Sequence, residues 1–272
     1  MDVHEALYTT RAMRRVRPDP IPADAQARIL DAAIRAPSGG NTQNWRFLLV
    51  DDPAVKGDIG PLYRDAIDQL WKTVYADRLA AAAADPDDPE NVQMAKVQRS
   101  AQHLADHFED VPLYLFGFVQ HDPSGGSIYP AVWSAMLAAR AEGIGSSLTS
   151  VLGFFHPAET LDALGVPRDE GWIMACCVSF GYPTGRLAVA PRRPVHEVSF
   201  RNRWGEPVGV EVPEPLWPPA VTPPGETHLT RVRNARPGPA PPGRRRGGTA
   251  LDRPGSPTGG TSRPGPPAGA VR

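Results

Sequence analysis

Three groups of polar residues have side chains and spacings suited to binding chemistry, and each lies at a joint between expected elements. The first group is Arg11, Arg14 and Arg15. Spaced three and four residues from Arg11, the other two guanidiniums can converge with it on one anion, and arginine suits bidentate contacts to phosphate. A solvated basic patch near a helix end has the same composition. The group therefore indicates either an anion site or a charged surface.

The second group is the segment PSGGNTQNW at residues 37–45, which follows an expected helix. Its two glycines allow the backbone to approach a ligand closely, and Ser38, Asn41 and Gln43 supply donors and acceptors within a few residues. An ordinary helix C-cap followed by a turn uses the same residue types, and the segment taken alone favours that interpretation.

The third group joins GIGSSLTS at residues 143–150 with PRRP at residues 191–194. A glycine-rich joint before a strand can offer backbone amides to a ligand, and Arg192 and Arg193 can hold another side of a phosphate. A helix-to-strand turn and a surface charge pair would look the same, so both interpretations stay open.

Other site chemistries find little support in the sequence. His103 and His107 are spaced for a metal pair on a helix, but no HExxH arrangement accompanies them, and surface histidines are the favoured interpretation, so no metal is predicted. Cys176 and Cys177 are adjacent in an apolar run and fit buried thiols in a reducing cytoplasm. There is no Walker loop, GxGxxG or GxSxG motif.

Composition divides the chain of 272 residues near residue 217. Residues 1–217 carry 20 basic and 28 acidic side chains, which argues against nucleic acid as the main partner of the body. Residues 218–272 carry 9 basic and 2 acidic side chains, are rich in Pro and Gly, and are predicted to be disordered. This tail either binds acidic surfaces or RNA, or is a non-functional product of read-through or a frameshift in GC-rich coding sequence, which is the favoured interpretation.

Neither a membrane span nor secretion is expected. No apolar run approaches the roughly 20 residues that a span needs, and the N-terminus lacks the apolar core of a signal peptide. The expected location is therefore the cytoplasm.

Hydrophobic periodicity predicts an alternation of helices and strands without an internal repeat. This order is typical of an α+β or α/β sheet packed by helices. Helices are predicted at residues 2–10, 23–36, 54–84, 92–108, 129–142 and 158–164, and strands at residues 46–52, 111–120, 143–153 and 171–183. Residues 199–217 have little core pattern and are predicted to form an arm that packs on another surface.

Taken in order, four blocks of the sequence resemble the nitroreductase family of flavin enzymes over about residues 2–198. The blocks are TTRAMRRV, AAIRAPSGGNTQNWRFLLV, YPAVWSAMLAARAEGIGSSLTSVLG and GYPTGRLAVAPRRPVHEV. The resemblance implies an α+β, three-layer α/β/α fold over residues 1–217. It also implies an intertwined homodimer with FMN at the interface of the two subunits.

The resemblance also assigns residues to FMN by position. One set grips the phosphate and the polar edge of the ring, a second is a loop that reaches FMN from the partner chain, and a third is a strand start beside the ring's reactive edge. The phosphate and the polar edge are assigned to Arg11, Ala12, Arg14 and Arg15, with the late Arg192 and Arg193. The loop from the partner chain is assigned to Ser38, Gly39 and Asn41, and the strand start to Leu148, Thr149 and Ser150.

Several positions depart from the family pattern. Thr10 replaces the first Arg of the usual Arg-Arg-Ser-x-Arg block and Ala12 replaces its Ser, so one hydroxyl contact to phosphate is missing. Asn44 stands where Pro is usual before a Trp, and Trp133-Ser134 stands where Gln-Asn is common. The changes at Asn44 and at Trp133-Ser134 bear on the flavin pocket, and hence on the substrate more than on the cofactor.

The implied activity is an NAD(P)H oxidoreductase with ping-pong kinetics, in which NADPH or NADH donates and a nitroaromatic, quinone or similar small molecule accepts. FMN carries the redox chemistry, which fits the lack of a catalytic triad or carboxylate pair. The helical segment 56–110 is a candidate lid over the flavin that sets substrate choice. The alternatives are a specialised flavin enzyme such as a reductive dehalogenase, and a protein that stores or senses FMN without turnover.

Overall fold

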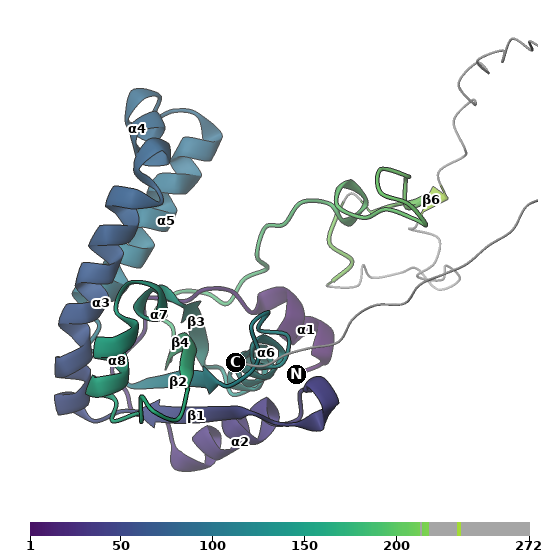
Figure 1. Ribbon diagram of the computed structural model, residues 1–272. Coiled ribbons are helices and arrows are strands. Elements are labelled where there is room, and N and C mark those ends of the chain that lie inside the picture. The colour runs from purple at the N-terminus through teal and green to yellow at the C-terminus, as the bar shows by residue number, and fades with distance from the viewer. Residues whose placement is uncertain (213, 218–232, 235–272) are drawn as a thin grey trace, which may run out of the picture.

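The computed structural model describes residues 1–212, 214–217 and 233–234 (Figure 1). Four strands form one antiparallel sheet in the order β1-β2-β4-β3: β1 (Trp45–Val50), β2 (Leu113–Val119), β3 (Gly145–Thr149) and β4 (Ile173–Gly181). Because neighbouring strands are antiparallel, the fold belongs to the α+β class and not to the α/β class.

Eight α-helices in the described residues surround or adjoin this sheet. They are α1 (Val3–Thr9), α2 (Ala23–Ala33), α3 (Pro53–Thr73), α4 (Ala76–Ala84), α5 (Pro89–Asp106), α6 (Ile128–Ala141), α7 (Val151–Phe155) and α8 (Pro157–Ala163), with 3-10 turns η1 (Gly39–Asn41) and η2 (Val195–Glu197). The two long helices α3 and α5 begin alike. Asp52 and Asp88 accept hydrogen bonds from the first free backbone amides, and a proline follows each at the first helical position.

Alternation along the strands gives the sheet two apolar faces and the molecule three layers. On the central strand β2, Leu113 and Leu115 pack with α2 and α6, whereas Tyr114 and Phe116 pack with α3 and α5. The adjacent cysteines of β4 divide in the same way and are both buried and free. The predicted three-layer α/β/α fold is thus confirmed.

The predicted strand at residues 143–153 is wrong in its second half. β3 ends at Thr149, and the chain turns at Ser150 into the short helix α7. Gly153 allows this turn, because a Cβ there would lie 2.6 Å from the carbonyl oxygen of Met174 on β4. Leu148, Thr149 and Ser150 therefore lie at the end of a strand and not at its start.

The helical segment from α3 to α5 has a buried base and a protruding tip. Ile59 and Tyr63 of α3 and Leu104 of α5 are fully buried against the sheet, whereas α4 buries no residue. Figure 1 shows α4 and the adjoining ends of α3 and α5 extending beyond the edge of the body. Among the described residues, no helix has the length and apolar character that crossing a bilayer requires.

The C-terminal arm leaves the body after β4. Figure 1 shows it running outward to a two-stranded ribbon of β5 (Val210–Glu211) and β6 (Arg233–Asn234). The arm then returns, and the ring of Trp217 lies 6.0 Å from that of Tyr8 on α1. Apart from β6, the tail at residues 218–272 that is predicted to be disordered lies outside the described residues.

Candidate functional site

An extended N-terminal segment, residues 10–17, runs along the free edge of β3, and we call it the strap. Ala12 forms a parallel bridge with Ser146, and the amide of Met13 donates to the Ser146 carbonyl at 2.9 Å. Further on, the amide of Arg17 donates to the carbonyl of Tyr182, just after β4, at 2.8 Å. The strap thus holds the three predicted arginines against the sheet edge.

Two glycines allow the strap to approach this closely. Gly145 and Gly181 are cross-strand partners at the ends of β3 and β4. A Cβ on Gly145 would lie 2.8 Å from the Cβ of Met13, and a Cβ on Gly181 would lie 2.7 Å from the Cβ of Val16. Any larger residue at either position would push the strap, and Arg14 with it, away from the sheet.

Arg14 is the most enclosed of the strap arginines. Its Nη1 donates to Ser100 Oγ on α5 at 3.4 Å, and burial lowers the pKa of its guanidinium. Tyr63, only 1% exposed, lies nearby, and its pKa is raised by burial despite the opposing effects of Arg14 and of a hydrogen bond with Thr149. Tyr63 is therefore a neutral group that links Arg14 to the end of β3.

Arg14 has no negative partner within the described part of the chain. None of the ion pairs there includes Arg14, although the side chain is half-buried and stays protonated at any physiological pH. A partly buried cation that lacks a carboxylate partner is costly. This arrangement favours an anionic or electron-rich ligand beside Arg14.

The end of β3 opens into a hollow of about 820 Å³ that includes Ser150, which we call the Ser150 hollow. Leu148 packs against the core, Thr149 is half-buried and Ser150 is exposed. Tyr129 of α6 and Phe154 of α7 line the hollow, and Phe154 is 72% exposed. Its aromatic walls suit a planar molecule, which can stack on them.

The late arginines lie beside the start of the strap. The segment after β4 runs antiparallel to it, since the amide of Thr184 donates to the Arg15 carbonyl and that of Ala190 to the Tyr8 carbonyl. This brings Arg192 and Arg193 toward the end of α1, close in the chain to Arg11. Arg192 is exposed, and its one hydrogen-bond partner in the described part of the chain is the neighbouring carbonyl of Pro191, whereas Arg193 pairs with Glu197 at 3.4 Å.

The loop at residues 38–41 lies elsewhere. It precedes β1, on the opposite edge of the sheet from the strap, so roughly 14 Å of sheet separates them at three strand spacings. The Gly39 amide donates to Ser127 Oγ at 3.3 Å, and Asn41 adopts a left-handed conformation with φ of 53°. Within one chain, Ser38, Gly39 and Asn41 therefore do not meet the arginines of the strap.

Sequence reasoning missed the residues that surround Arg14. Tyr63 and Ser100 lie within helical patterns whose periodicity indicates only which residues pack in the core. The sequence also does not show that Gly145 and Gly181 lie opposite each other, because that pairing depends on the register of β3 and β4.

The fold and the strap define the class of protein. The structure is similar to that of the FMN-dependent nitroreductase NfnB from Mycobacterium smegmatis in complex with NADPH. The TM-score is 0.54 and the identity 22%, over 73% of this chain and 97% of that one.

Sequence comparison identifies the family. The model of the Nitroreductase family matches residues 7–182, and the chain belongs to that family. It is 32% identical to a 5,6-dimethylbenzimidazole synthase from Rhodospirillum rubrum, over 66% of this chain and 81% of the relative. It is 29% identical to an NADH dehydrogenase from Thermus thermophilus, over 73% of this chain and 95% of the relative. Membership of this family supports a flavin-dependent oxidoreductase.

Proposed function

We propose that the protein is an FMN-dependent NAD(P)H oxidoreductase, and the observation that carries the proposal is the half-buried Arg14. Its only described hydrogen-bond partner is the hydroxyl of Ser100, and Tyr63 beside it is neutral. The polar edge of a flavin ring is an electron-rich partner of the kind that such a cation lacks. The residues present therefore fit FMN.

The phosphate of FMN would be held at the other end of the strap. Arg11 and Arg192 are exposed and free of carboxylate partners in the described residues, so both guanidiniums are available to a dianion. Ala12 supplies no hydroxyl there. We expect phosphate affinity to depend more heavily on these two arginines than it would with a serine at position 12.

When bound, FMN supplies the capacity to accept a hydride from the donor and to pass electrons on to the acceptor. The chain supplies orientation and charge. Arg14 would stabilise negative charge on the pyrimidine side of the ring, and Thr149 and Ser150 are the residues proposed for its reactive edge. No side chain has to act as a nucleophile or general base.

The Ser150 hollow is the proposed binding place for donor and acceptor in turn. Nitroaromatic compounds and quinones are planar, and Tyr129 and Phe154 offer aromatic surfaces for stacking. Because the two substrates use the same space, one must leave before the other binds. This gives ping-pong kinetics, with parallel lines in double-reciprocal plots.

A homodimer completes the proposed site. The loop at residues 38–41 lies on the far edge of its own sheet, so it can reach a flavin on the strap only if that strap belongs to the partner subunit. The proposed lid comprises residues 56–110. Its protruding tip at α4 has no buried residue, so this part can move over a ligand without disturbing the core.

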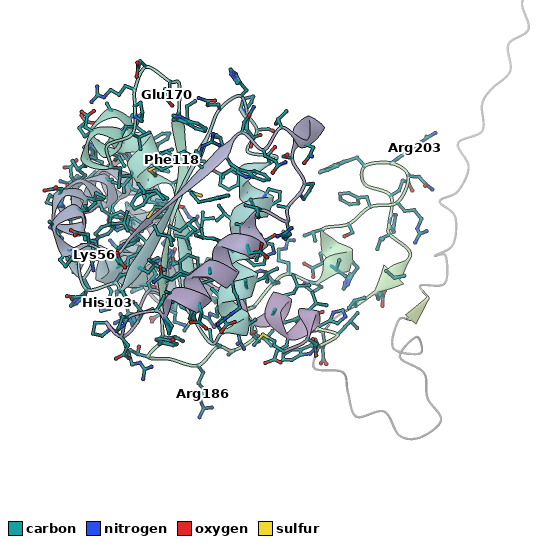
Figure 2. All side chains as sticks on the ribbon, turned by 90° about the horizontal axis from the view of Figure 1, so that it is seen from below. Lys56, His103, Phe118, Glu170, Arg186 and Arg203 are labelled. Carbon is teal, nitrogen blue, oxygen red and sulfur yellow. The ribbon has the colours of Figure 1, made fainter. Side chains whose placement is uncertain are left out.

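The first test is the absorbance spectrum of the purified protein, which should be yellow and contain about one FMN per chain. Arg14→Gln should weaken FMN binding by at least about tenfold, or about 1.4 kcal/mol. Arg186→Gln is the matched control, because Arg186 projects away from the body (Figure 2). Added NADPH or NADH should bleach the flavin, and a nitroaromatic or quinone should restore its colour. Colourless protein that takes up no added FMN would contradict the proposal.

The relative from R. rubrum favours a second candidate, the formation of 5,6-dimethylbenzimidazole. The flavin ring contains the same dimethyl-substituted benzene ring, so the compound can be sought chromatographically after incubation with FMN, NADPH and air. Its appearance in proportion to enzyme, with loss of FMN, would favour this candidate over the oxidoreductase.

A further inference from the structure

A second depression of about 510 Å³ lies beside the strap, and we call it the His103 cleft. Figure 2 shows His103 at the margin of the body. The residues that line the cleft come from the strap, from the end of α5 and from the segments that flank β2 and β4: Arg14, Arg15, Val16, Pro18, His103, His107, Asp110, Val111 and Thr184.

The charges in this cleft are not balanced. His103 lies on the last turn of α5 and His107 directly follows the helix, and their ring centroids are 4.4 Å apart. Arg15 is exposed and belongs to none of the ion pairs within the described residues. The one carboxylate that lines the cleft, Asp110, lies 2.9 Å from His107 Nδ1. Two guanidiniums and two imidazoles thus share a single acidic side chain.

The titration of His103 reflects this imbalance. Its pKa is lowered by burial first, and then by the positive charges of Arg15 and His107, against the opposing effect of Asp106 and Asp110. His103 is therefore neutral at pH 7 and can donate from only one of its ring nitrogens. An anion placed between Arg15 and His103 would remove the repulsion and favour protonation of the histidine.

A metal ion is a poorer occupant than an anion. The described residues contain no group of three or more His, Cys, Asp or Glu side chains arranged to hold a metal. Arg15, beside the histidine pair, would also repel a cation.

We propose that the His103 cleft binds a phosphate dianion, either free or as a monoester, held by Arg15 and by ring N–H groups of His103 and His107. This chemistry has two sources, inorganic phosphate and the 2′-phosphate of NADPH. The second source rests on the proposed function. Arg14 lines the cleft and is also the residue proposed to contact the flavin, so the cleft adjoins the proposed flavin site.

Calorimetric titration with 2′-AMP and with inorganic phosphate tests the site without any turnover. His103→Gln/His107→Gln should weaken binding of 2′-AMP by about tenfold, as expected for the loss of a charge-assisted hydrogen bond. His4→Gln, an exposed histidine on α1, should bind like the wild type. Asp110→Asn should strengthen binding severalfold, a gain that a misfolded protein cannot produce. Equal affinity in all variants, or no binding in the wild type, overturns the proposal.

Steady-state kinetics then distinguish the two sources. If the cleft holds the donor, the double histidine variant should raise KM for NADPH about tenfold and leave kcat and the KM for NADH unchanged. If the double histidine variant binds 2′-AMP more weakly but has the same KM for NADPH as the wild type, the cleft is a phosphate site and its ligand is free phosphate. A protein that binds phosphate here but takes up no FMN would refute the proposed function and leave the cleft assignment intact.

Discussion

Arg14 owes its position to two residues that carry no functional group. Gly145 and Gly181 leave room for Met13 and Val16, and this contact holds the strap against β3 and β4. A sequence shows the arginine but not the glycine pair. The position of a functional side chain therefore depends on backbone contacts that are known only once the strand register is known.

Gly145→Ala should destabilise the protein by about 1–3 kcal/mol, because the new methyl group overlaps Met13 at 2.8 Å in a packed region. It should also weaken FMN binding, since Arg14 moves with the strap. Urea unfolding and an FMN titration measure the two effects.

Gly57→Ala is the control for this substitution. Gly57 lies within α3, and a Cβ added there would have no atom within 4 Å, so the change should stabilise the helix by about 0.5–1 kcal/mol and leave FMN affinity unchanged. If Gly145→Ala also left stability and FMN affinity intact, the strap would not depend on the close approach at β3.

At the level of elements, the sequence predicted most helices and strands because their signals are local. The apolar stripe of α6 is buried as its periodicity predicts. The helix predicted at residues 54–84 is divided into α3 and α4, and α5 begins at Pro89, three residues before its predicted start. The boundary between β3 and α7 could not be predicted, because the apolar run there continues through both. The antiparallel strand order and the separation of the loop and strap to opposite edges depend on contacts distant in sequence.

An ion pair joins α3 to the turn that follows α5, and its contribution should depend on pH. Arg64 Nη2 lies 2.9 Å from Glu109 Oε1, and this hydrogen bond lowers the pKa of Glu109 below its ordinary value of 4.5. A carboxyl with a lowered folded-state pKa stabilises the protein above its unfolded pKa and loses that effect as pH falls through the folded value.

Glu109→Gln should therefore lower the free energy of unfolding at pH 7 and make little difference near pH 3. The loss should stay below about 1 kcal/mol, because solvent screens a pair whose side chains are more than one-third exposed. Urea unfolding at both pH values measures it, with Asp58→Asn on α3 as a control outside any described ion pair. An equal difference at both pH values would show that the pair does not account for the effect.

At the scale of the whole molecule, the resemblance to the family predicted the three layers and two ligand-binding segments. One chain forms the three layers but does not bring the two segments together. The loop at residues 38–41 precedes β1 and the strap runs outside β3, and these two edge strands are three strand spacings apart in the sheet. If both segments bind the same flavin, each site must combine the strap of one subunit with the loop of the other.

This arrangement predicts complementation between two inactive variants. Arg14→Gln damages the strap, and Asn41→Asp places a negative charge in the loop while keeping a residue type that tolerates the left-handed conformation found there. Each variant alone should bind FMN weakly. When the two are unfolded together and refolded as a mixture, heterodimers should regain one intact site. In that site, the Asn41→Asp chain supplies an unaltered strap and the Arg14→Gln chain supplies an unaltered loop.

The amount recovered distinguishes this geometry from a site within one chain. Random pairing makes half of all dimers mixed, and each mixed dimer has one of two sites intact, so about a quarter of the wild-type FMN content should return. Separate refolding of each variant controls for refolding itself, and light scattering should report two chains per particle. A mixture that binds no more FMN than its components would contradict this geometry, because mixing restores only a site that combines the strap of one subunit with the loop of the other.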